Sequence, residues 1–159
     1  MNEFYHRVYG DDIVAHYPDQ QLQRDWLCAS DSSLIADVLD PEQAITVVKI
    51  PFAEEEYDRQ IEVEAEIVGD VLEAYLESAI AADKVMVVTP RHKQRVAVEH
   101  QIQLRSLDRG KAKVDTVDKM QGQEGPLVLA CFTFNEVTGR ELDFLLDFRR
   151  WNVTVSRAK

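Results

Sequence analysis

The sequence predicts an α/β domain built on an open, mainly parallel β-sheet with helices on both faces. Short β-branched runs alternate with stretches of helical periodicity, an alternation typical of right-handed βαβ units. Several runs are apolar on successive residues, as in strands that are covered on both sides. The chain has 159 residues, of which 45% are hydrophobic and 30% charged, which suits one globular domain.

The expected elements can be justified in chain order. Residues 44–50, AITVVKI, are β-branched and lie between two prolines, which predicts a strand. Residues 61–80 carry apolar side chains at helical spacing with glutamates between them, which predicts an amphipathic helix. The remaining expected elements are a strand at 85–89, a helix from 92 to 107 ended by a turn at 108–110, strands at 112–117 and 127–134, and a helical pattern from 147 onward.

Charge is distributed unevenly along the chain. The net charge is −11, yet residues 81–159 hold 14 basic and 10 acidic side chains, whereas residues 1–80 hold 4 basic and 19 acidic ones. Local charge, rather than the global value, governs where a phosphate can dock. On charge alone, two solvated faces explain this distribution better than a nucleic-acid site does.

Several classes of protein do not fit the sequence. No apolar run approaches the length of a membrane span, and no secretion signal is evident at the start, so we expect no membrane partner and a cytoplasmic or nucleoid location. Cys28 and Cys131 lie far apart, the four histidines show no ligand spacing, and no metal site is expected. Cys131 lies in an apolar run and is expected to be a buried, reduced thiol.

Polar residues gather after two of the predicted strands. Ligands of open α/β sheets bind beyond the carboxyl ends of the strands. Thr89-Pro90 follows one strand, and the segment TVDKMQGQE, residues 116–124, follows another. Thr116 can offer a hydroxyl and a backbone N–H to a phosphate, and Gly122 permits a close backbone approach or a positive φ. The alternative is an ordinary loop with a turn glycine.

The chain ends in a basic segment, RRWNVTVSRAK. On a helix, Arg150 and Arg157 share a face with Thr154 between them, whereas Trp151 and Val155 form a separate apolar stripe. A helix anchored by one stripe that projects arginines from another suits a phosphate chain. A basic surface helix is the alternative.

These two segments carry a resemblance to a known family. TVDKMQGQE resembles motif V, and RRWNVTVSRAK resembles motif VI, of superfamily 1 helicases, with Thr154 and Ser156 in place of alanine and threonine. The branch is the one that contains the nonsense-mediated-decay helicase, senataxin and the replication helicase–nucleases. VVTPRHKQ at 87–94 and NEFYHRVYGDDI near the start are similar to further segments of that branch, in the same order and spacing.

The resemblance implies a RecA-like domain, the second of two that close over ATP and Mg²⁺ while single-stranded DNA or RNA crosses their top. By motif position, Arg157 resembles the arginine finger aimed at the γ-phosphate. Gln121 and Gly122 resemble phosphate-side contacts, and Glu124 the contact to the ribose. The residues that resemble nucleic-acid contacts are Thr89, Pro90 and Thr116.

The sequence also departs from the family pattern. It contains no G-x-x-x-x-G-K-S/T motif, so residues 1–159 are expected to be one RecA-like domain, a fragment that is inactive without the first motor domain of the same protein. Glu64-Ala65 matches an N-x-x-E-A context, but Ile61 replaces the asparagine, and Tyr57 and Arg59 lie nearby without aligning. The alternative function is a stand-alone, non-catalytic protein that docks on a helicase or on nucleic acid.

Overall fold

The computed structural model describes residues 32–40, 43, 45–51, 57–78, 84–120, 122–133 and 154. The chain divides into two compact units, Met1–Val48 and Lys49–Lys159. In the first unit, helix α2 spans Ser33–Val38 and none of its residues is buried. The hydroxyl of Thr46 donates to the carbonyl oxygen of Asp37 at 3.4 Å. The other described helices and strands belong to the second unit.

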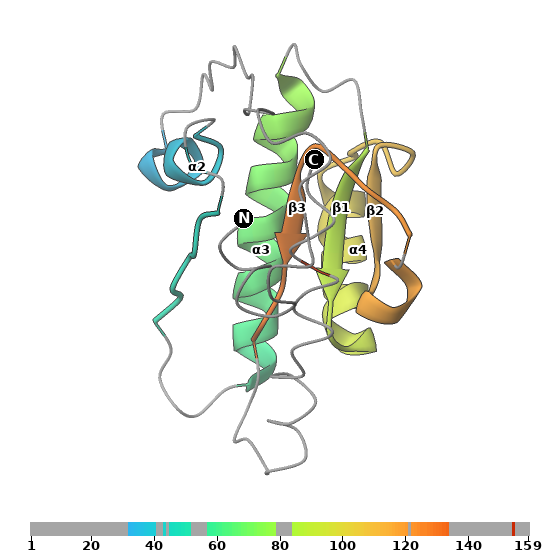
Figure 1. Ribbon diagram of the computed structural model, residues 1–159. Helices are drawn as coiled ribbons and strands as arrows, with labels where there is room; N and C mark the ends of the chain where they lie inside the picture. Colours follow the sequence, from blue (N-terminus) through green and yellow to red (C-terminus); the bar gives the residue numbers. More distant parts are fainter. Residues whose placement is uncertain are drawn as a thin grey trace, which may run out of the picture. The chain divides into compact units, whose positions relative to one another are not determined.

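The second unit contains a three-stranded parallel sheet with the strand order β2-β1-β3 (Figure 1). Strand β1 spans Val85–Thr89, β2 spans Ala112–Thr116 and β3 spans Val128–Ala130. Both neighbours of β1 run parallel to it. The open parallel α/β sheet expected from the sequence is therefore confirmed.

Every residue of β1 is buried, because both of its faces are covered. On one face, Met86 and Val88 form an apolar cluster with Met120, which belongs to the 3-10 helix η2, Val117–Met120. Helix α4, His92–Leu104, contacts β1 and β2. The continuous apolar run in the sequence thus reflects coverage on both sides, as expected for a central parallel strand.

Two helices pack against each other beside the sheet. Helix α3 spans Tyr57–Glu77 and packs along α4 (Figure 1). The apolar residues that predicted α3 form its buried stripe, whereas most of its glutamates remain exposed or half-buried. The buried members of the predicted stripe are Ile61, Ala65, Val68 and Leu72.

A basic side chain fixes the α3–α4 contact. Arg105, at the end of α4, donates to Asp70 at 2.6 Å and lies 3.5 Å from Glu73 Oε2. Its guanidinium covers Gly69, where an added Cβ would lie 2.8 Å from Arg105 Cζ. A side chain at position 69 would therefore displace the Arg105 guanidinium from this place on α3.

The structure corrects the boundaries of two expected elements and removes one element. The predicted strand 44–50 is wrong for its described residues, because 45–50 have no regular secondary structure. The predicted strand 127–134 is ordered as a strand only at Val128–Ala130, and this edge strand is half-buried rather than buried. Helix α4 ends at Leu104 rather than 107, because the chain turns through Ser106 with a φ of 54°. The helical pattern from 147 lies outside the described residues except for Thr154, which is helical.

Candidate nucleic-acid interface

The carboxyl ends of β1 and β2 lie side by side. The strands are in register, and their last residues, Thr89 and Thr116, are direct partners. Thr89 is fully buried and its hydroxyl donates to the carbonyl oxygen of Asp115 at 3.5 Å. Pro90 and Thr116 are half-buried. Of the three predicted nucleic-acid residues, Pro90 and Thr116 are therefore the two that reach the surface at this edge.

Cationic side chains surround the end of β2. Oδ1 of Asp115 accepts a hydrogen bond from the Thr116 backbone N–H at 2.9 Å. The same oxygen lies 3.6 Å from Lys119 Nζ and 3.8 Å from Arg95 NH1. Three donors from β2, η2 and α4 thus converge on one carboxylate oxygen, beside the predicted phosphate contact.

The two basic side chains differ in how firmly they are held. Lys119 is 65% exposed, whereas Arg95 is 24% exposed, with its guanidinium near Glu99 as well as Asp115. The buried Nε of Arg95 has no hydrogen-bond partner among the described residues. Lys119 is therefore the more accessible of the two cations at this edge, whereas Arg95 is shared between Glu99 and Asp115.

Gly122 and Glu124, two of the nucleotide-side residues predicted from motif V, lie on the segment that follows η2. Beyond η2 the chain turns back along the sheet, where Gln123 accepts a hydrogen bond from Lys113 of β2. Gly125 lies beside the start of β1, so closely that an added Cβ would lie 2.8 Å from the Lys84 carbonyl oxygen. Gly122 and Glu124 lie on this return segment, both exposed. This segment thus begins beside η2, where Gln123 donates to the carbonyl oxygen of Lys119 at 3.1 Å, and it reaches the start of β1 at Gly125.

Gly122 adopts a φ of +79°, and nothing lies within 4 Å of the position that a Cβ would take. This positive φ confirms the expectation of special backbone geometry at Gly122. Gln121 and Arg157 lie outside the described residues. Thr154 was expected on the arginine-bearing face of its helix, yet it is buried, so that face is covered at least at this position.

A buried polar cluster, which the sequence did not predict as a site, ties α3 and α4 to the end of β3. Oε1 of Glu64 accepts hydrogen bonds from the backbone N–H groups of Phe132 at 2.7 Å and Thr133 at 2.9 Å. Gln94 donates to Glu64 Oε2 at 3.0 Å and to the Thr133 carbonyl oxygen at 2.9 Å. β1 has ended at this level, so Glu64 and Gln94, rather than β1, form these hydrogen bonds with the backbone of Phe132 and Thr133.

The same cluster affects the neighbouring thiol. Cys131 is buried and free, which confirms the expected reduced cysteine. Burial, and secondarily the negative charge of Glu64, raises the pKa of the Cys131 thiol well above its ordinary value of 9.0. Cys131 is therefore an uncharged core residue rather than a nucleophile.

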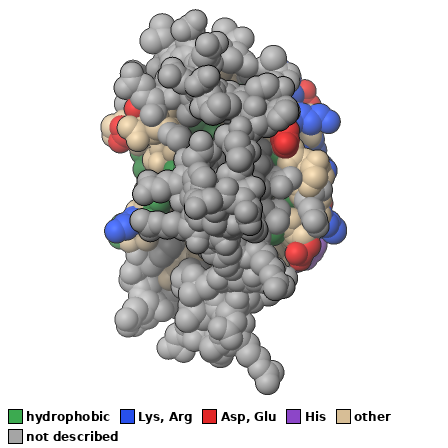
Figure 2. Space-filling model, in the orientation of Figure 1, with side chains coloured by type: hydrophobic (Ala, Val, Ile, Leu, Met, Phe, Trp, Pro, Cys, Tyr) green, Lys and Arg blue, Asp and Glu red, His purple; other side chains and the backbone are tan. Residues whose placement is uncertain are grey.

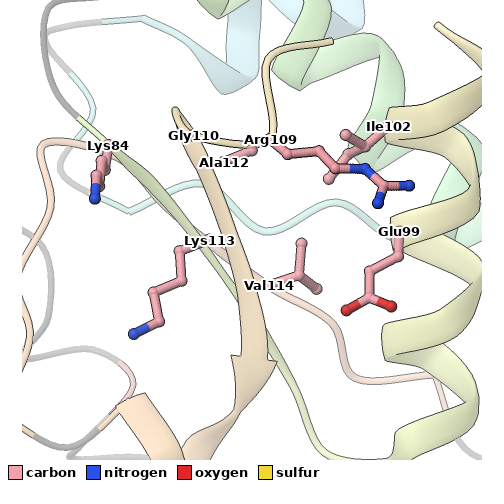
Figure 3. Close-up of a pocket in the computed structure, with 8 residues that line it drawn as sticks. All are labelled: Lys84, Glu99, Ile102, Arg109, Gly110, Ala112, Lys113 and Val114. Atoms are coloured by element: carbon pink, nitrogen blue, oxygen red, sulfur yellow. The ribbon is translucent and has the colours of Figure 1, made fainter. Parts of the chain in front are cut away.

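The described residues also form a hollow and a charged surface, and neither provides a second anion site. A hollow of about 460 Å³ surrounds the amino end of β2. Figure 3 shows that Lys84 and Lys113 lie on one side of β2, whereas Arg109 lies on the other side with Glu99, so the three cations do not converge on one anion. Figure 2 shows acidic and basic side chains together on the described surface in view, rather than a patch of one sign.

No group of histidine, cysteine and acidic side chains among the described residues could hold a metal ion. No described helix combines the length and apolarity of a membrane span. Arg59, near the weakly matching N-x-x-E-A context, forms an ion pair with Glu62 of its own helix at 3.3 Å.

Comparison with known proteins gives a consistent result. The chain is 28% identical over 151 residues to the DNA replication ATP-dependent helicase/nuclease DNA2 of Xenopus laevis, covering 92% of this chain and 14% of that protein. It is 25% identical over 163 residues to the human protein of the same name, covering 94% of this chain and 15% of that protein. The DNA polymerase alpha-associated DNA helicase A of Schizosaccharomyces pombe is 31% identical over 97 residues, covering 60% of this chain and 14% of that helicase.

The chain thus spans about a seventh of the length of the curated relatives it matches. The matched family is described as an AAA domain, and its match extends over residues 3–159. That extent covers the strands, the helices and both motif segments of the sequence. The chain therefore belongs to this AAA domain family of superfamily 1 helicases, as a C-terminal helicase domain.

Proposed function

We propose that this chain is the second RecA-like motor domain of an ATP-dependent DNA helicase, and that the edge formed by Pro90 and Thr116 carries part of its single-strand track. The observation that carries the proposal is the register of β1 and β2, which sets these two residues side by side with Arg95 and Lys119 next to them. Small polar groups and cations at a strand edge suit the phosphate backbone, which they contact without reading the bases.

On the nucleotide side, the proposal assigns ATP to the face that carries Gly122 and Glu124. The open backbone at Gly122 and the exposed carboxylate of Glu124 fit this assignment, since a phosphate can approach the first and a ribose hydroxyl can donate to the second. Gln121 would contribute a further phosphate-side contact. ATP with Mg²⁺, held mainly by the first motor domain, would supply the transferable phosphoryl group. Arg157 would neutralise charge on the phosphate from this domain.

Binding of single-stranded DNA tests the track. The chain should bind a labelled oligo-dT weakly in fluorescence anisotropy, with an affinity that falls as salt rises, because phosphate contacts release counterions. Thr116→Ala removes the hydroxyl and should weaken binding by roughly 3- to 10-fold, as expected for one hydrogen bond to a charged group. Thr46→Ala, in the other unit, serves as the control. Absence of binding at low salt would falsify the track assignment.

The role of Arg157 is tested in the full-length helicase that contains this domain. Arg157→Lys should lower the DNA-stimulated ATP turnover by at least ~10²-fold, because lysine lacks the planar fork that spans two phosphate oxygens. Arg109→Lys, at the far end of the sheet, should leave turnover unchanged. The thermal unfolding midpoint should hardly move in either variant. If Arg157→Lys retains most of the turnover, Arg157 is not the arginine finger.

A further inference from the structure

One carboxylate occupies the place where the proposed track would receive a phosphate. Oδ1 of Asp115 accepts the Thr116 N–H at 2.9 Å and lies 3.6 Å from Lys119 Nζ and 3.8 Å from Arg95 NH1. A backbone N–H and two cations are the donors that a phosphate oxygen uses in proteins. The Thr116 N–H, which could donate to a phosphate of the DNA backbone, therefore already donates to the Asp115 carboxylate.

The contacts of Asp115 with the two cations are loose. Both separations exceed a hydrogen-bond length, and the Lys119 side chain is 65% exposed. Ion pairs of this exposure contribute little to stability. Arg95 also lies near a second carboxylate, with its Nε 3.8 Å from Glu99 Oε1. Neither cation is thus hydrogen-bonded to Asp115, although both lie within ion-pair distance of it.

The backbone of Asp115 is held independently of its side chain. Its carbonyl oxygen accepts the Thr89 hydroxyl at 3.5 Å, and the residue pairs in register with Val88 of β1. A rotation about χ1 can therefore remove the carboxylate from the Thr116 N–H while β2 stays in place. The donors that remain would face the solvent at the carboxyl edge of the sheet.

We propose that Arg95, Lys119 and the Thr116 N–H form a subsite for one phosphodiester of single-stranded DNA, and that Asp115 competes for this subsite as an internal anion. The inference rests on the proposed function and extends it to Arg95, Lys119 and Asp115, to which the resemblance gives no role. A phosphodiester group offers two charged oxygens, so it can accept from the N–H and from both cations at once. Because a fraction of molecules holds Asp115 in the subsite, the apparent affinity for DNA is lowered by that fraction.

Asp115→Asn is the direct test, since asparagine keeps the size of the side chain but loses its charge. In fluorescence anisotropy with labelled oligo-dT, Asp115→Asn should bind about 3- to 10-fold more tightly at low salt. The slope of log affinity against log salt should steepen by about 1 to 2, because one or two further cations engage phosphate. Asp108→Asn removes the same charge at the other end of β2, where its Oδ1 accepts the Gly110 N–H at 2.7 Å. This control should change affinity by less than about 2-fold without a change in slope.

A second substitution separates a shared subsite from a general charge effect. Lys119→Gln, at an exposed position, should weaken binding and should abolish most of the gain caused by Asp115→Asn in the double variant. Equal gains in Asp115→Asn and Asp108→Asn, or an undiminished gain when Lys119 is absent, would overturn the subsite. If neither the wild-type chain nor Asp115→Asn binds DNA, the proposed function fails together with this inference. Wild-type binding with no effect of Asp115→Asn refutes the inference alone.

Discussion

Two carboxylates near the strand ends, Glu64 and Asp115, both accept backbone N–H groups, but their surroundings differ. Glu64 is 8% exposed, and its three hydrogen bonds, of 2.7, 2.9 and 3.0 Å, all come from neutral donors. The side chain of Asp115 is 19% exposed, with one such bond at 2.9 Å and two cations at 3.6 and 3.8 Å.

The difference shows how one chemical group serves two purposes. A buried carboxylate with short hydrogen bonds to fixed donors cannot readily be replaced by another anion. Its removal would leave those donors without an acceptor in the protein interior. A carboxylate near solvent with distant, mobile cations can be replaced by another anion at little cost. We therefore interpret Glu64 as a fixed part of the fold and Asp115 as an exchangeable part of the interface.

The largest effect is expected at Glu64. Glu64→Leu keeps an apolar surface on α3 but leaves the N–H groups of Phe132 and Thr133 without an acceptor. Each buried unsatisfied group costs about 1–3 kcal/mol, so the free energy of unfolding should fall by roughly 3–5 kcal/mol. Urea denaturation followed by circular dichroism measures this loss.

Glu62→Leu provides the matched control, because Glu62 is exposed on the same helix and forms an exposed ion pair with Arg59 at 3.3 Å. It should change the free energy of unfolding by no more than about 0.5 kcal/mol. Gln94→Leu should destabilise less than Glu64→Leu, and the double variant should be non-additive because the two side chains share a hydrogen bond. If Glu64→Leu is as stable as Glu62→Leu, Glu64 is not a fixed part of the fold.

Much of the fold could be predicted from the sequence. Strand β1 occupies the predicted residues 85–89, since four successive apolar residues followed by Thr89 and Pro90 indicate a short buried strand. Helix α3 begins at Tyr57, four residues earlier than the predicted start at 61, because its first turn is polar and lies outside the apolar periodicity. Residues 45–50 are as β-branched as β1, yet they form no strand among the described residues. A strand depends on a partner, and nothing local in the sequence encodes that partner.

Some parts of the candidate site could likewise be predicted from the sequence, and others could not. Thr116 and Pro90 could be predicted, because they follow apolar runs and the carboxyl ends of parallel strands share one edge. Glu64 could also have been found, since its spacing from Ile61 and Val68 places a carboxylate on the buried stripe. The contact of Asp115 with Arg95 could not, because the two residues are brought together only by the packing of α4 against β2.

The smallest effect on stability is expected at Asp115. The same chemical change, from a carboxylate to an amide, can be made at Asp115 and at Glu64, so the two effects can be compared directly. In Asp115→Asn, Oδ1 can still accept the Thr116 N–H, and only two long ion pairs are lost. The free energy of unfolding should therefore change by no more than about 0.5 kcal/mol.

In Glu64→Gln, by contrast, the new amide would place an N–H₂ group against the N–H₂ group of Gln94, so at least one buried hydrogen bond is lost. This substitution should lower the free energy of unfolding by about 1–3 kcal/mol. Urea denaturation of the two variants side by side measures the difference. If Asp115→Asn destabilises the chain as much as Glu64→Gln does, Asp115 holds the end of β2 in place. In that case a phosphate could not displace it without loosening the sheet.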